Sequence, residues 1–316
     1  MVTDAASGSE GAVTLGVGIS REVRKAADNQ RLRPLDNGVQ YFPMEPQISP
    51  PRRVHGVDFS GAQNAGKLIW VASCLIDGDS LRVEDCRPAA ELPRSGRDLG
   101  RALTALRDFI AESRDCVFGL DFPFGLPRSL IQDEDWESFI RSFPNSYPSA
   151  GEFKRACFEA AGRKELKRLT DCESRTPFSP YNLRLYKQTY FGIRDVLTPL
   201  VLSGQVRVLP MQRPESGKAW VLEICPASTL ERRQLPLSFK GSKPGRYESR
   251  LRILQAIEST TPLSIGDSSR LRVLEDRGGD ALDSIIAACA VFAALPNLAH
   301  LGREKPDYAL EGYVYA

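Results

Sequence analysis

The chain has 316 residues, of which 42% are hydrophobic and 26% are charged. This composition is that of an ordinary globular protein and excludes a chain that is disordered throughout. The 42 Lys and Arg residues nearly balance the 40 Asp and Glu residues, and the net charge of +2 excludes a strongly basic nucleic-acid coat protein. No stretch approaches the roughly 18 uninterrupted apolar residues that span a bilayer, so we expect no membrane association.

The cysteines and the first residues indicate a compartment. The seven cysteines are odd in number, scattered, and without a C-x-x-C pair, which is typical of reduced intracellular thiols. The first residues lack the basic and apolar segments of a secretory signal. We therefore predict a cytoplasmic location. Residues 1–52 are rich in Gly, Ser, Pro, Asn and charge, which predicts a flexible extension before one domain over residues 53–316.

Three antiparallel strands are predicted at the start of this domain. Residues 53–59 and 67–76 are apolar runs, and Asn64-Ala65-Gly66 between them has turn chemistry, so the two runs should form a hairpin. An Asp-Gly-Asp turn then leads to residues 80–86, in which apolar and polar residues alternate as on a half-buried strand.

Helices and strands alternate in the rest of the domain. Apolar residues at helical spacing predict a helix over residues 99–110, and a nearly continuous apolar run predicts a buried strand over residues 116–122. A fifth strand is predicted over residues 220–226 and an apolar closing helix over residues 279–295. Between them, residues 127–204 read as a helical insertion. Its predicted helices cover residues 135–143, 150–170 and 182–202.

Several carboxylates interrupt or end these elements. They are Asp58, Asp121, Glu223, Asp280 and Asp283. Ionised carboxylates are costly to bury unless they are paired or bound to a cation. If they converge, their mutual repulsion is relieved most simply by a hard divalent cation with oxygen ligands, and we expect Mg²⁺ or Mn²⁺.

The segments around these acids resemble a known family. They are Gly56-Val-Asp58-Phe-Ser-Gly, Gly119-Leu-Asp121-Phe-Pro-Phe-Gly-Leu-Pro, Leu222-Glu223-Ile-Cys-Pro226 and Asp280-Ala-Leu-Asp283. Their combination and order resemble the domain-of-unknown-function 429 family, whose members are predicted nucleases with an RNase H-like fold. The resemblance implies an α/β fold with a mixed five-stranded sheet, three antiparallel strands plus two parallel ones, flanked by helices and carrying the helical insertion.

The same resemblance implies a catalytic site. The first and fourth strands of that fold are parallel neighbours, so Asp58 and Asp121 should meet, with Glu223 joining from the fifth strand and Asp280 or Asp283 approaching from the closing helix. The implied chemistry is two-metal hydrolysis of a phosphodiester, in which Asp58, Asp121, Glu223 and Asp283 are catalytic, and these four or Asp280 bind the metal.

A structural role for the same acids stays open. Asp58 and Asp121 could instead satisfy backbone amides at strand ends, and the two helix aspartates could cap the last helix. Asp280 directly follows Gly278-Gly279 at the helix start, whereas Asp283 lies about one turn inside, where a capping role is less natural.

The insertion contains the residues predicted to bind substrate. Between residues 150 and 200 the basic residues exceed the acidic ones by four, and between residues 228 and 252 they exceed them by five. This local charge predicts a polyanionic partner, DNA or RNA. The predicted substrate-binding residues are Arg163, Lys164, Lys167, Arg168, Arg184 and Lys187. The alternative is that they form a solvated helix face.

Other chemistries find less support. The segment 61–67 satisfies G-x-x-x-x-G-K, but Leu68 stands where a phosphate-binding P-loop needs Ser or Thr. Two histidines cannot build a three-histidine zinc site, and a G-x-S-x-G nucleophile motif is absent. Two alternatives to a nuclease remain: a nucleotide-binding ATPase of the actin-like branch of the fold, and a non-catalytic nucleic-acid or protein-binding module.

Overall fold

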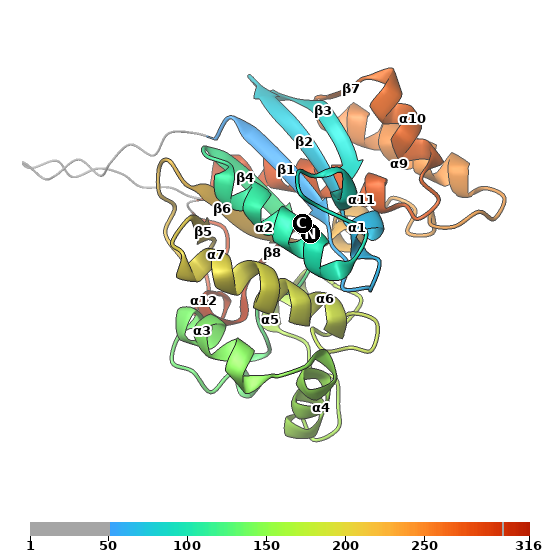
Figure 1. Ribbon diagram of the computed structural model, residues 1–316. Coiled ribbons are helices and arrows are strands. Elements are labelled where there is room, and N and C mark those ends of the chain that lie inside the picture. Colours follow the sequence, from blue (N-terminus) through green and yellow to red (C-terminus); the bar gives the residue numbers. More distant parts are fainter. Residues whose placement is uncertain (1–50, 299) are drawn as a thin grey trace, which may run out of the picture. The chain divides into compact units, whose positions relative to one another are not determined.

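The predicted strands belong to one mixed sheet of eight strands in the computed structural model, which describes residues 51–298 and 300–316. The strand order is β5-β6-β4-β1-β2-β3-β7, and β8 pairs with β6 (Figure 1). The α/β class with a mixed sheet flanked by helices is thus confirmed, although the sheet has more strands than the five predicted. The extension predicted over residues 1–52 lies, apart from its last two residues, outside the described residues. The strands are β1 (Arg53–Asp58), β2 (Trp70–Asp77), β3 (Ser80–Pro88), β4 (Cys116–Leu120), β5 (Val206–Val208), β6 (Ala219–Ile224), β7 (Leu263–Ile265) and β8 (Val314–Tyr315).

Strands β1, β2 and β3 form the predicted antiparallel meander, and β1 also pairs in parallel with β4, which pairs in parallel with β6. The predicted turn at residues 64–66 is different, because Ala65–Leu68 forms the short helix α1 and β2 begins only at Trp70. The three strands that were not predicted, β5, β7 and β8, have three, three and two residues. Segments this short contain too few residues for an alternating pattern to be visible.

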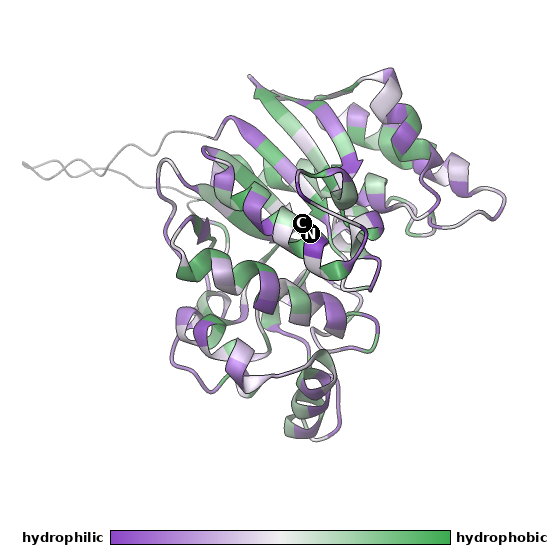
Figure 2. Ribbon diagram, in the orientation of Figure 1, coloured by the Kyte–Doolittle hydropathy of each residue, from purple (hydrophilic) through white to green (hydrophobic). Residues whose placement is uncertain are grey.

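Helices cover both faces of the sheet. On one face α2 packs with the insertion around a core that includes Val57, Phe118 and Leu120. On the other face α11 packs with α9 and α10 around a core that includes Val54, Val117 and Leu222. Figure 2 shows hydrophobic residues concentrated in the central strands and hydrophilic ones on outward parts of the helices. The helices are α2 (Leu99–Glu112), α3 (Trp136–Ser146), α4 (Ala150–Ala160), α5 (Leu169–Glu173), α6 (Tyr186–Phe191), α7 (Thr198–Leu202), α8 (Pro226–Arg232), α9 (Arg246–Thr260), α10 (Asp267–Glu275), α11 (Asp280–Ala294) and α12 (Tyr308–Glu311).

Helix α11 is the central helix of the second core. A Cβ atom on Gly56 of β1 would lie 2.0 Å from the Ser284 carbonyl oxygen, and one on Gly119 of β4 would lie 2.5 Å from a Val291 methyl group. Only glycine therefore allows these two strands to approach the helix so closely. The segment Asp280–Asn297 has the length and hydropathy of a bilayer span, but 67% of it is buried inside the fold. Its apolar character is that of a core helix.

The helix predicted over residues 150–170 is interrupted. Helix α4 ends at Ala160, Gly162 and Arg163 adopt positive φ angles of 63° and 61°, and helical structure resumes at Leu169. Positive φ is incompatible with a continuing right-handed helix. The basic residues between 163 and 168 therefore lie in a connecting loop and do not share one helix face. By contrast, the predicted helix over residues 182–202 is present from Tyr186 onward as α6, a π-helical turn over Gly192–Leu197, and α7.

Candidate functional site

The carboxyl ends of three parallel strands meet at one edge of the sheet. Asp58 is the last residue of β1, and Asp121 directly follows β4, its parallel neighbour. Strand β6 runs parallel to β4 and carries Glu223 near its end. A cavity of about 640 Å³ opens at this edge, and all three acids line it. Ligand sites of α/β proteins commonly occupy this edge.

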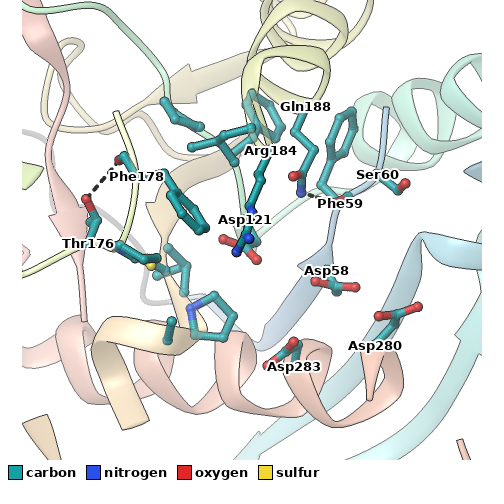
Figure 3. A pocket seen from close by; sticks show the side chains of 18 of the residues that line it. Asp58, Phe59, Ser60, Asp121, Thr176, Phe178, Arg184, Gln188, Asp280 and Asp283 are labelled. Atoms are coloured by element: carbon teal, nitrogen blue, oxygen red, sulfur yellow. Dashed lines mark hydrogen bonds between the residues drawn. The ribbon is translucent and has the colours of Figure 1, made fainter. Parts of the chain in front are cut away.

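Side-chain alternation decides which acids share a face of the sheet. Asp58 is two residues from Gly56, and Asp121 is two residues from Gly119, and both glycines contact α11. Since side chains alternate along a strand, both carboxyls point toward the α11 face. Figure 3 shows them converging on the cavity above the α11 residues Asp280 and Asp283.

Asp58 and Asp121 form a carboxyl pair, because each influences the pKa of the other. The Asp58 residue is 6% exposed. Burial is the main cause that raises the pKa of both carboxyls, and Asp283 raises each further, whereas the Lys240 ammonium lowers both. Among the described residues no backbone amide donates to either carboxyl, which argues against the purely structural role. The pair thus needs a proton or a cation to be tolerated.

The first turn of α11 contributes Asp280 and Asp283, and both face a lysine that was not among the predicted site residues. The Lys240 Nζ lies 2.6 Å from Asp283 Oδ2 and 3.3 Å from Asp280 Oδ1. Burial lowers the pKa of Lys240, but Asp283, Asp58 and Asp280 outweigh it and hold that pKa above its usual value. Lys240 is therefore a resident positive charge beside the carboxylates. Among the described residues, no group of three or more His, Cys, Asp and Glu side chains is arranged to hold a metal ion.

The cap of α11 is provided by a residue that the sequence did not single out. Asp276 accepts hydrogen bonds from the Gly278 and Ala281 amides, at 3.1 and 2.9 Å. Asp280 makes no side-chain cap hydrogen bond, because the N-cap position is occupied by Gly279. Asp280 therefore does not cap α11. Both α11 aspartates line the cavity and form ion pairs with Lys240.

Glu223 is held in a separate buried network. Its Oε2 accepts hydrogen bonds from the Phe124 amide at 2.9 Å and from Arg168 Nη1 at 2.8 Å, and Arg168 Nη2 donates to its Oε1. Arg168 also binds Asp171 through Nε and Nη2, and the Glu311 carbonyl through Nη1. All five N–H donors of the guanidinium are used, and both Glu223 oxygens are occupied.

The position of Glu223 follows from the alternation of β6. Its neighbours Leu222 and Ile224 belong to the α11 core, so Glu223 points to the opposite face, toward the insertion. The prediction that Glu223 joins the aspartates is therefore met only in part: it lines the same cavity, but its carboxylate serves Arg168. Arg168 was predicted to bind substrate from a helix face shared with other basic residues, and the shared helix face was wrong because the helix is interrupted there. Arg168 lines the cavity, but it is 1% exposed and its donors are engaged by acceptors.

The other predicted substrate-binding residues divide into two groups. Arg184 and Lys187 are exposed and line the cavity. Arg163 and Lys164 are exposed on the loop after α4 and do not line it. Lys167 donates to the Thr176 carbonyl and does not line it either. Two cations of the insertion thus face the carboxylates across the cavity.

The cavity wall opposite α11 is partly aromatic. Phe178 carries the Arg184 guanidinium 5.5 Å from its ring centroid, a cation–π contact. Gln188 donates to the Phe59 carbonyl and ties α6 to the loop that follows β1 (Figure 3). Phe178 was not predicted, because an isolated aromatic residue in a proline-rich loop gives no periodic signal. Lys240, by contrast, lies in a basic segment that the charge pattern did indicate.

Cysteine and histidine catalysis has no support in this geometry. Cys225 lines the cavity, but burial, and after it the Asp121 charge, raises the pKa of its thiol to about 12, so the thiolate nucleophile is absent at neutral pH. His55 lies within β1, is 3.0 Å from the Ser73 hydroxyl and stacks on Phe118. Burial lowers the pKa of His55 to about 3. It is the strand residue that the sequence predicts.

Comparison of the chain with protein-family models, with curated proteins and with solved structures finds no match.

Proposed function

We propose that the protein is a divalent-metal-dependent nuclease that hydrolyses phosphodiester bonds of DNA or RNA. The observation that carries the proposal is the carboxyl pair of Asp58 and Asp121, buried side by side at the ends of parallel strands and facing a cavity with cations on its rim. Two adjacent carboxyls whose ionised forms are disfavoured by burial form an oxygen-rich site for a hard cation.

The strand arrangement supports an RNase H-like assignment and the resemblance to the domain-of-unknown-function 429 family. An antiparallel meander of β1, β2 and β3 is extended by the parallel strands β4 and β6, with β1 and β4 as neighbours. This is the pairing that the resemblance implies. Strands β5, β7 and β8 are additions at the margins of that arrangement.

The donor set fits Mg²⁺ or Mn²⁺. Asp58 and Asp121 would hold the cation, and Asp283, which lines the same cavity and is ion-paired with Lys240, would be a third oxygen donor. Asp280 lies farther out on the first turn of α11, beside Lys240. When bound, the cation would activate a water molecule and stabilise the leaving oxygen of the phosphodiester.

The remaining residues of the site bind and orient. Arg184 and Lys187 place positive charge on the rim, where it attracts a phosphodiester backbone. Phe178 offers an apolar ring face on which a base can stack. The Arg168–Glu223 pair fixes the Phe124 amide, and through it the loop that carries Asp121. This buried network is a positioning device, since its own polar groups are already satisfied.

A cleavage assay tests the proposal. Purified protein is incubated with Mg²⁺ or Mn²⁺ and labelled single strands, duplexes, RNA–DNA hybrids and junctions. We expect cleavage that chelation abolishes, and a loss of at least about a hundredfold in Asp58→Asn and Asp121→Asn. The exposed turn variant Asp77→Asn is the matched control and should retain activity. Cleavage that survives both site substitutions would refute the mechanism.

The same preparations separate the alternatives. Binding of nucleic acid without cleavage of any substrate would favour a non-catalytic module. Thermal stabilisation by magnesium-ATP, but not by oligonucleotides, would favour an ATPase of the actin-like branch, because a ligand that binds only the folded state raises its apparent stability.

A further inference from the structure

A second cavity, of about 610 Å³, lies beside the start of α9. Four cationic residues line it, namely Lys243, Arg246, Arg250 and Arg277, with Glu275 as the one acidic residue of its lining. We refer to it as the basic pocket. It carries three net positive charges and is not part of the carboxylate site.

Arg250 is the most informative residue of the basic pocket. It is 3% exposed, and its Nε and Nη1 donate to the Leu274 and Phe239 carbonyls at 2.8 and 2.9 Å. These acceptors are neutral, and Arg250 forms no ion pair with any described residue. A buried cation without a counter-ion is costly, whereas the buried Arg168 has two carboxylates.

The other cations of the pocket are also without acidic partners. Lys243 and Arg277 are exposed and form no ion pair within residues 51–298 and 300–316, and Arg246 donates to Ser238. Glu275 is exposed and pairs with none of them in the same ranges. The pocket therefore concentrates unpaired positive charge around a buried guanidinium, and an anion with several acceptor oxygens would compensate it.

The basic pocket is joined to the carboxylate site through one short segment. Arg250 binds the carbonyl of Phe239, and the Gly241 amide donates to the Arg277 carbonyl at 2.6 Å. Lys240, between these two residues, reaches the carboxylates of α11. An anion in the basic pocket would thus lie directly behind the segment that places Lys240 in the first cavity.

We propose that the basic pocket binds a backbone phosphate of the nucleic-acid strand whose neighbouring phosphodiester lies at Asp58 and Asp121. That the pocket binds an anion follows from its unpaired positive charges. That this anion is a nucleic-acid phosphate rests on the proposed function. A phosphate suits it because arginine forks bind phosphate oxygens in pairs. The subsite extends the binding surface from the rim cations of the insertion to the opposite side of the cavity.

Binding of a labelled single-stranded oligonucleotide to the cleavage-deficient Asp121→Asn protein tests this subsite. In that background Lys243→Gln/Arg277→Gln should weaken binding about tenfold and reduce the slope of log K against log salt by about 0.7, the value for one lost phosphate contact on a single strand. Arg252→Gln is the matched control, since Arg252 is exposed on the same helix but does not line the pocket. It should change neither quantity.

Three results would overturn the subsite. They are unchanged binding in the double variant, an equal loss in Arg252→Gln, and saturable binding of inorganic phosphate at the pocket with no effect of the double variant on the oligonucleotide. The last result would assign the pocket to a free anion.

The outcome for the subsite is separable from that for the nuclease. If no substrate is cleaved but the double variant still weakens oligonucleotide binding, the nuclease proposal fails and the phosphate pocket stands. If the wild-type protein cleaves, and Lys243→Gln/Arg277→Gln made in the protein that keeps Asp121 has the same KM and salt dependence, the pocket assignment fails and the nuclease stands.

Discussion

Two groups of buried carboxylates line the same cavity, and they are stabilised in different ways. Glu223 and Asp171 lie against Arg168, whose five donors are all engaged and which forms ion pairs with both acids. Asp58 and Asp121 lie on the other face of the sheet, where burial and Asp283 raise the pKa of both. The first group has a cation bonded to both of its acids, whereas the cation nearest the second group, Lys240, is ion-paired with Asp280 and Asp283.

This difference separates structural from functional acids. A buried carboxylate that is bonded on every oxygen stabilises the geometry around it but has little capacity left for a ligand. A pair that repels when ionised reduces stability and is retained where a ligand relieves the repulsion. We therefore propose that Glu223 has a positioning role and that Asp58 and Asp121 bind a cation.

The largest expected effect concerns the group bonded to Arg168. Arg168→Met should destabilise the protein by about 3–5 kcal/mol, because it leaves Asp171 and Glu223 buried without a cation. Urea unfolding measures this change. The exposed Arg175→Met should change the free energy of unfolding by less than about 0.5 kcal/mol. Neutralising both acids in the Arg168→Met background should restore part of the loss, and wild-type stability of the single variant would contradict the account.

A substitution in the pair of Asp58 and Asp121 should have the opposite effect and increase the stability of the protein. Without metal, Asp121→Asn should stabilise the folded protein by about 1–3 kcal/mol at pH 8, since it removes a buried carboxyl whose ionised form is disfavoured by burial and by Asp283. Burial and the neighbouring Asp283 raise the pKa of Asp121 above that of the unfolded chain, which is about 4. Its protonated form therefore favours folding below pH 4, and this contribution is lost as the pH rises through the folded-state pKa.

The stability difference between Asp121→Asn and the wild-type protein should depend on pH. The advantage of Asp121→Asn over the wild-type protein should be small at pH 4 and should grow toward pH 8, as measured by urea unfolding in the presence of a chelator. Mg²⁺ should reduce the difference by stabilising only the wild-type protein. A variant that is less stable than the wild type throughout this range would remove the distinction between the two groups.

Most of the central strands and helices, and part of the candidate site, can be predicted from the sequence. The meander, the buried fourth strand and the apolar last helix follow from periodicity, and Asp58 and Asp121 stand out because charges interrupt apolar strands. The alternation of β6 would also have placed Glu223 on the other face, since Leu222 and Ile224 flank it. That signal is local, but using it requires knowing which face α11 covers.

Other features could not be derived from local patterns. The break after Ala160 depends on positive φ angles at Gly162 and Arg163, so the basic residues that follow resemble a helix face until their backbone is known. The burial of Arg168 depends on Glu223 and Glu311, which are 55 and 143 residues away. Lys240 reaches its aspartates from a loop whose path no periodicity determines.

The most direct test of the central claim is the anomalous scattering of Mn²⁺ in crystals of the protein soaked with the ion. The account predicts a Mn²⁺ peak coordinated by Asp58 and Asp121, and no such peak in Asp121→Asn crystals. A fully occupied Mn²⁺ elsewhere, with no metal bound to either carboxyl, would contradict it.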